Sequence, residues 1–212
     1  MRLPVLACLL AMTVASPSLA AGPRYPLDDI ARVLEPGEKL PCQRGDLELI
    51  SYSGEHLRYQ KPLRIHPAFK AQLVAFEALV EELAIQHYGR APRRIVHLGS
   101  YACRVMRRYP DWVSEHALGN ALDVAGFDFG PLPRDSQRSD LPRHLKGAFQ
   151  VRLLNHWQAT GKNAPHAAFL KELAERIIAR PDIFHVILGP AWPGHKNHFH
   201  LDHAPYRVVE VF

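Results

Sequence analysis

Apolar residues recur at three- and four-residue steps along two stretches of the chain, which is the pattern of a helix with one buried face. The first stretch opens at Pro67 and stops at Gly89, residue types that favour the first turn and the end of a helix. Its apolar positions are Phe69, Leu73, Phe76, Val80 and Leu83. The second stretch covers residues 167–179, and we predict a helix in both. Two more helices are predicted near residues 27–34 and 145–158.

Short apolar runs bounded by Gly, Pro or Ser predict strands. Residues 47–52 and 56–58, separated by Ser53 and Gly54, are typical of a hairpin. The other predicted strands cover residues 95–98, 121–129, 183–188 and 198–201, and the proline-rich residues 130–142 are predicted as a surface loop. Helices come first and the strands with polar clusters come late. This order favours an α+β fold, with helices packed on a small, mostly antiparallel sheet.

The first twenty residues have the pattern of an export signal. Arg2 precedes a short apolar run, and Ser18, Leu19 and Ala20 form the small-x-small pattern that signal peptidase reads. We therefore expect residues 1–20 to be a signal peptide, 21–45 an N-terminal arm and 46–212 the domain, in the periplasm. A lipoprotein signal ending at Cys8 is the alternative, but it leaves almost no hydrophobic segment ahead of the cysteine.

Charge and hydropathy exclude two classes of partner. The net charge is +5, and adjacent basic residues occur only at positions 93–94 and 107–108, so there is no basic stripe of the kind that binds nucleic acid. After the leader, no apolar stretch reaches the length of about 18 residues that a membrane span needs. We therefore expect neither nucleic-acid binding nor stable membrane insertion, and the oligomeric state stays open.

Two cysteines remain after the leader, Cys42 and Cys103. In an oxidising compartment an isolated pair usually forms a disulfide. Closing a loop of this length would stabilise the fold by about 4 kcal/mol. The alternative is a pair of zinc thiolates, although neither cysteine has the second cysteine nearby that metal clusters usually have. The disulfide would hold the arm beside the segment that carries Tyr101 and Arg104.

Four of the 13 histidines fall within nine residues, at positions 195, 198, 200 and 203. Side chains two apart on a strand share one face, so His198 and His200 should lie side by side. Neutral imidazole is a common zinc ligand, and a metal ion would account for both rings. The pattern alone leaves metal binding open.

A second polar element places His116 seven residues before Asp123, with small or apolar residues between them. Gly119 allows a tight turn that would bring His116 back to the start of the strand of Asp123. Val124 and Ala125 follow, so the carboxylate should be at least half-buried, and a cation would compensate it. The alternative is a capping or salt-bridged Asp123 with His116 at the surface.

The spaced pattern Ser114-x-His116-x-x-Gly119-x-Ala121-x-Asp123, followed by His198-x-His200, resembles the zinc peptidases that include lysostaphin-type endopeptidases, D-Ala-D-Ala carboxypeptidases and the hedgehog domain. More closely, the sequence resembles the bacterial extensin-like C-terminal domain family, from about Cys42 to Asp202. The segments that carry this resemblance are residues 101–104, 114–117, 123–127, 188–190 and 198–202.

The resemblance implies roles for individual residues. His116, Asp123 and His200 match the ligands of one catalytic Zn²⁺. His198 matches the histidine beside the bound water, and His195 shares that role in one related group. Arg104 matches an arginine that holds a substrate carbonyl or carboxylate. The implied function is zinc-dependent hydrolysis of peptide bonds in peptidoglycan, by an endo- or carboxypeptidase, so peptidoglycan peptides are the expected partners.

Two departures from the relatives qualify these roles. Asn197 occupies the position where some carboxypeptidases carry a glutamate base, so the base must come from elsewhere, and His156 and His185 stand where many relatives have a second cysteine pair. Asp202 and His203 are candidates for orienting a ligating imidazole. Two other functions stay open, a wall-binding or scaffold protein with a vestigial zinc site and a histidine-rich zinc buffer.

Overall fold

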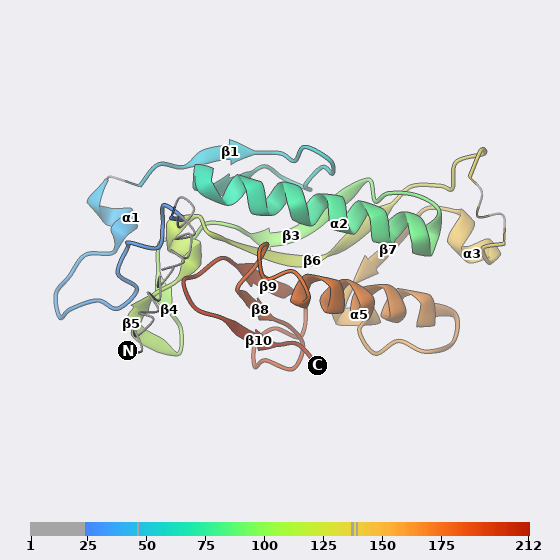
Figure 1. Cartoon of the computed structure of the whole chain (residues 1–212). Helices are drawn as coiled ribbons and strands as arrows, with labels where there is room; N and C mark the ends of the chain where they lie inside the picture. Colours follow the sequence, from blue (N-terminus) through green and yellow to red (C-terminus); the bar gives the residue numbers. More distant parts are fainter. Residues whose placement is uncertain (1–23, 46, 137, 139) are drawn as a thin grey trace, which may run out of the picture.

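The computed structural model describes residues 24–45, 47–136, 138 and 140–212 (Figure 1), so the predicted signal peptide lies outside the described residues. Its main sheet has the strand order β10-β8-β9-β6-β3, and β7 pairs with β6 as well. All pairings in this sheet are antiparallel except that of β10 with β8. The fold is thus a mixture of helices and sheets, compatible with the predicted α+β class. The strands are β3 (Arg94–Gly99), β6 (Ala121–Phe129), β7 (Phe149–Arg152), β8 (Val186–Leu188), β9 (Phe199–Asp202) and β10 (Val208–Glu210).

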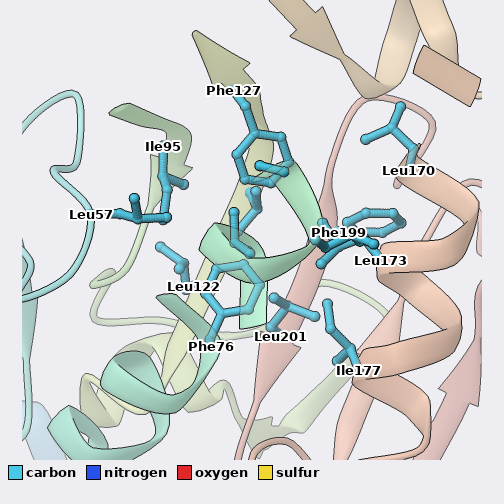
Figure 2. Packing of buried hydrophobic residues seen from close by; sticks show 14 of the residues in the cluster. Leu57, Phe76, Ile95, Leu122, Phe127, Leu170, Leu173, Ile177, Phe199 and Leu201 are labelled. Carbon is cyan, nitrogen blue, oxygen red and sulfur yellow. The ribbon is translucent and has the colours of Figure 1, made fainter. Parts of the chain in front are cut away.

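Two long helices, α2 (Lys70–Tyr88) and α5 (Ala164–Ile178), pack on the main sheet. A 3-10 turn, η1 (Pro67–Phe69), leads into α2, and Gly89 ends α2 in the left-handed conformation with φ 67°. Both predicted helices are therefore confirmed. Figure 2 shows where they meet the strands: Phe76 of α2 and Leu173 of α5 lie among side chains from β6 and β9.

The central strand β6 separates a core face from a polar face. Leu122, Val124 and Phe127 are fully buried in the cluster with the helices. Asp123 lies between two of these residues, so its side chain points to the opposite face of the sheet. This alternation places the carboxylate on the side of the sheet away from α2 and α5.

The predicted hairpin of residues 47–52 and 56–58 is wrong. Strand β1 (Ile50–Tyr52) instead pairs with β2 (Leu63–Ile65). The fully buried carboxylate of Glu77 explains the difference, because it accepts hydrogen bonds from the backbone N–H groups of residues 55, 56 and 57. Those donors are therefore not free to form a ladder.

The helix predicted over residues 145–158 is also wrong. This segment forms α3 (Arg143–Lys146), β7 and α4 (Leu153–His156) in succession, and η3 (Gly161–Asn163) follows before α5. Val151 of β7 is fully buried and lies opposite Phe127 of β6. Pairing with β6 satisfies the backbone and buries this side chain, which overrides the local helical pattern.

The N-terminal arm, residues 24–45 in the described chain, has no helix at residues 27–34, so that prediction is wrong as well. It runs through turns and bridges Val33 to Trp112, and a short helix, α1 (Pro41–Arg44), follows. Trp112 lies on β5 (Tyr109–Val113), which pairs with β4 (Val105–Met106), a small sheet that was not predicted. The predicted disulfide between Cys42 and Cys103 is confirmed and ties the arm to the rest of the fold.

No helix in the described part of the chain combines the length and the apolar composition needed to cross a membrane.

Candidate metal centre

Three segments bring one polar side chain each to the same point. Asp123 of β6 and His200 of β9 are direct partners in the antiparallel register, on the same face of the sheet. His116 comes from η2 (Glu115–Leu118), a single 3-10 turn that leads into β6. Gly119 ends this turn at φ 65°, and a Cβ there would lie 2.7 Å from the backbone nitrogen of His66. Only glycine fits this turn, which folds His116 back over Asp123.

The facing atoms of the three residues form a nearly equilateral triangle. Nε2 of His116 lies 3.2 Å from Oδ1 of Asp123 and 3.2 Å from Nδ1 of His200. The third side, from Nδ1 of His200 to Oδ1 of Asp123, is 3.0 Å. Two ligands of a tetrahedral zinc ion with bonds of about 2.0–2.1 Å are separated by about 3.3 Å. The triangle therefore has the size of one face of a zinc coordination tetrahedron.

The outer nitrogens of the two imidazoles are held by acceptors, which fixes the protonation of each ring. Nδ1 of His116 donates to the backbone carbonyl of Ser100 at 3.2 Å, and Nε2 of His200 donates to Oδ2 of Asp202 at 2.8 Å. A neutral imidazole has one N–H, so the inner nitrogens carry lone pairs. Two lone pairs and a carboxylate oxygen then face one another, an arrangement that requires a cation or a shared proton.

The electrostatics at the triangle also favour a cation there. Burial raises the pKa of the Asp123 carboxyl, but without a cation at the triangle the rings of His116 and His200 can donate to it, which outweighs burial and holds this pKa well below its usual range. Burial lowers the pKa of His200, but Asp123 and Asp202 outweigh it and raise the pKa to about 10. The two carboxylates thus produce a strongly negative local potential, which favours any positive charge at the triangle.

The donor set fits zinc. Among the residues that the structure describes, His116, Asp123 and His200 are the group of three that could hold a metal ion. Two nitrogens and one carboxylate leave a fourth position for water or substrate, as in catalytic rather than structural zinc sites. The cysteines are not available as ligands, because Cys42 and Cys103 are joined to each other, so the zinc-thiolate alternative is wrong.

The two other histidines predicted at the site lie beside the triangle. Nε2 of His198 is 3.7 Å from Oδ1 of Asp123, and its Nδ1 lies 2.9 Å from Oδ1 of Asn197. The ring of His195 lies against that of His198, with centroids 4.7 Å apart, and 5.9 Å from that of His200. Burial is the main cause that lowers the pKa of both rings, for His195 to about 4. Both are therefore neutral near pH 7.

Arg104 lies at the edge of this group rather than in it. Its backbone carbonyl accepts a hydrogen bond from Ser114 N–H, which ties it to the segment ahead of His116. Its guanidinium is exposed and donates to the carbonyl of Val105 at 3.3 Å. In the described structure no hydrogen bond joins this guanidinium to the triangle.

No local sequence pattern identifies several of the residues that hold the site in place. Ser100 acts through its backbone carbonyl, and any residue type has one. Arg32 forms a buried ion pair with Glu115, 83 positions away, so no local pattern indicates it. Asp202 is the exception, since its spacing of two from His200 puts both on one face of a strand.

Together, the fold and the site define a mixed α/β domain with a His-Asp-His cluster on the polar face of its sheet. The model of the family described as extensin-like protein C-terminus matches residues 31–211, and the chain belongs to this family. The match begins in the arm, upstream of the expected start near Cys42. A search of the curated proteins found no match for this chain, and a search of the solved structures found none.

Proposed function

We propose that the protein is a zinc-dependent hydrolase of peptide bonds in peptidoglycan, acting in the periplasm, and that it belongs to the zinc peptidase superfamily named above. The observation that carries the proposal is the triangle of His116, Asp123 and His200, with two inner lone pairs and an acceptor oxygen within 3.2 Å of one another. His198 and His195 supply neutral imidazoles beside it. The disulfide suits an oxidising compartment.

In this proposal the residues of the chain have separate tasks. A bound zinc ion supplies Lewis-acid polarisation of the scissile carbonyl and lowers the pKa of water toward about 7. Nε2 of His198, 3.7 Å from Oδ1 of Asp123, takes the proton of the attacking water and returns it to the departing amine. Asn197 accepts the Nδ1–H of His198 and so keeps the Nε2 lone pair toward the site. Arg104 holds a substrate carbonyl or carboxylate.

The test is digestion of purified peptidoglycan by the zinc-loaded protein, with and without a chelator, with the products identified by mass. We expect soluble peptide products, none after chelation, and none from His116→Ala or Asp123→Ala. A matched control is His56→Ala, which removes a half-exposed histidine far along the chain from the triangle. Full activity in both triangle variants would show that the site assignment is wrong.

This digestion, together with a sedimentation assay and a count of bound zinc ions, separates the two alternatives. A wall-binding protein with a vestigial site would pellet with peptidoglycan and release nothing. A zinc buffer would hold several ions per chain, whereas the proposal requires about one. The product masses would also distinguish an endopeptidase, which opens cross-links, from a carboxypeptidase, which removes terminal residues.

A further inference from the structure

A buried ion pair connects the N-terminal arm to the turn that carries His116. Nε of Arg32 lies 2.7 Å from Oε1 of Glu115, and the second guanidinium nitrogen lies 3.1 Å from Oε2. The two residues are only 6% and 1% exposed. Glu115 directly precedes His116 in η2. A two-point contact between rigid groups therefore fixes the start of this turn.

The same network reaches the strand that carries His200. The side chain of Asn120 donates to Oε2 of Glu115 at 2.6 Å and to the carbonyl of His203 at 3.0 Å. Its Oδ1 accepts a hydrogen bond from the hydroxyl of Tyr25 in the arm at 2.5 Å. His203 follows Asp202, the carboxylate that holds His200. Asn120 thus joins the turn of His116 to the end of β9.

The arm is fastened at two further points near the same turn. The third nitrogen of Arg32 donates to the carbonyls of Leu27 and Ile30, so the guanidinium also fixes the course of the arm. At the other end, Cys42 is bonded to Cys103, whose neighbour Ala102 donates its N–H to the carbonyl of His116 at 3.1 Å. In Figure 1 this blue segment lies against the η2 and β4–β5 region.

We infer that the arm positions the metal ligands, with Arg32 and Glu115 as positioning residues. The side chains of Arg32 and Glu115 hydrogen-bond to each other, to the arm and to Asn120 rather than to the three residues of the triangle. Their effect passes through the backbone of η2 to His116 and through Asn120 to the end of β9. The inference rests on the metal site of the proposed function but not on hydrolysis, because zinc binding alone tests it.

The experiment measures the zinc dissociation constant by competition with a chromophoric chelator, in full-length Arg32→Met and Glu115→Gln. Circular dichroism first establishes a temperature at which each variant is folded. We expect zinc affinity to fall about tenfold or more in Arg32→Met, within the range for groups that support metal ligands. Glu115→Gln keeps one acceptor oxygen, which at the Oε2 position can serve both Asn120 and one nitrogen of Arg32, and loses the acceptor for Nε of Arg32, so a smaller loss of zinc affinity is expected.

Two comparisons separate positioning from stability. Arg152→Met breaks the ion pair with Asp128 at the other end of β6 and should lower stability but leave zinc affinity unchanged. Replacing both partners, in Arg32→Met with Glu115→Met, restores an uncharged buried contact and recovers stability, yet the affinity should stay low because Asn120 has lost its acceptor. The visible spectrum of bound Co²⁺ should change in both Arg32 variants.

The inference would be overturned if folded Arg32→Met bound zinc with wild-type affinity. It would also be overturned if Arg152→Met lost as much zinc affinity as Arg32→Met. If Arg32→Met does not fold, the double variant and Glu115→Gln decide in its place. Loss of wall hydrolysis with normal zinc affinity would contradict the proposed function but not this role of the arm.

Discussion

Nε2 of His200 lies 2.8 Å from Oδ2 of Asp202, a carboxylate that is 2% exposed and whose other oxygen accepts the N–H of Ala204 at 3.0 Å. The backbone contact holds the carboxylate in place, and the carboxylate in turn holds the imidazole. The ring is therefore oriented with Nδ1 toward the triangle before any ion arrives. Such groups behind a metal ligand set both its tautomer and its basicity.

Replacing this carboxylate should weaken metal binding without removing a ligand. In Asp202→Ala the ring of His200 loses its acceptor and can present the wrong nitrogen, so we expect zinc affinity to fall by about 10–100-fold. Chelator competition measures the change. Asp182→Ala is the control, because that carboxylate forms an exposed pair with Arg180. Unchanged affinity in Asp202→Ala would show that the sheet alone orients His200.

Zinc should also raise thermal stability, because it binds the folded chain. At a free concentration about 100 times its dissociation constant, a ligand stabilises by about 2.7 kcal/mol. For a domain of this size that corresponds to a rise in Tm of about 5–10 °C. His116→Ala should lose the rise, whereas His87→Ala, which breaks a contact with Glu172 on the helices, should keep it. Differential scanning calorimetry with and without zinc provides the measurement.

The parts of the fold that could be predicted are those decided by local pattern. The helix after Pro67 has an apolar face that repeats with the helical period, and residues 121–129 form a nearly continuous apolar run of the kind that predicts a buried strand. Residues 145–158 have a similar repeat but form a strand at their centre, because Val151 finds a buried place opposite Phe127. No local pattern contains that information.

The candidate site also has a part that the sequence could predict and a part that it could not. The residue pattern indicates His116, Asp123 and the pair His198 and His200 as candidates, and the family resemblance selects His200 as the third ligand. The residues that hold these ligands in place could not be predicted, because Ser100 contributes a backbone carbonyl and Arg32 contacts Glu115 across 83 positions. The polar groups of the arm find their partners and become buried only in the tertiary fold, so no local pattern indicates their role.

Acid should destabilise the protein in part through His166. This ring is 4% exposed, and burial is the main cause that lowers its pKa to about 4, with His156 and His144 adding to it. Between pH 6.5 and pH 4 the unfolded chain therefore binds a proton that the folded chain excludes, so stability is lost as the pH falls through this window.

Comparison with His166→Gln isolates this contribution, since other buried histidines titrate in both proteins. The free energy of unfolding of the wild type should fall by about 1–3 kcal/mol more than that of the variant between pH 7 and pH 4. Urea titrations at several pH values measure both curves. Parallel curves would mean that His166 can take up a proton within the folded protein.

The disulfide should contribute strongly to stability. It closes a loop with a sequence separation of 61, for which the chain-entropy model gives about 4 kcal/mol. The double variant Cys42→Ser with Cys103→Ser should therefore have a free energy of unfolding that is lower by about this amount, measured by urea titration. Reduced wild-type protein should show the same loss. A loss well below 1 kcal/mol would indicate that residual structure restrains the unfolded chain even without the disulfide.

Catalysis should depend on His198 in a way that metal binding does not. Its Nε2 is 3.7 Å from Asp123, outside the triangle, so His198→Ala should retain about one zinc ion per chain. The rate of peptide release from peptidoglycan should nevertheless fall by about 10²–10⁴-fold, as expected on removal of a general base. The rate should fall less in His195→Ala, because the ring of His195 contacts His198 rather than Asp123. If His195→Ala is the more damaged of the two at full zinc content, then His195 is the base, and His198 orients it.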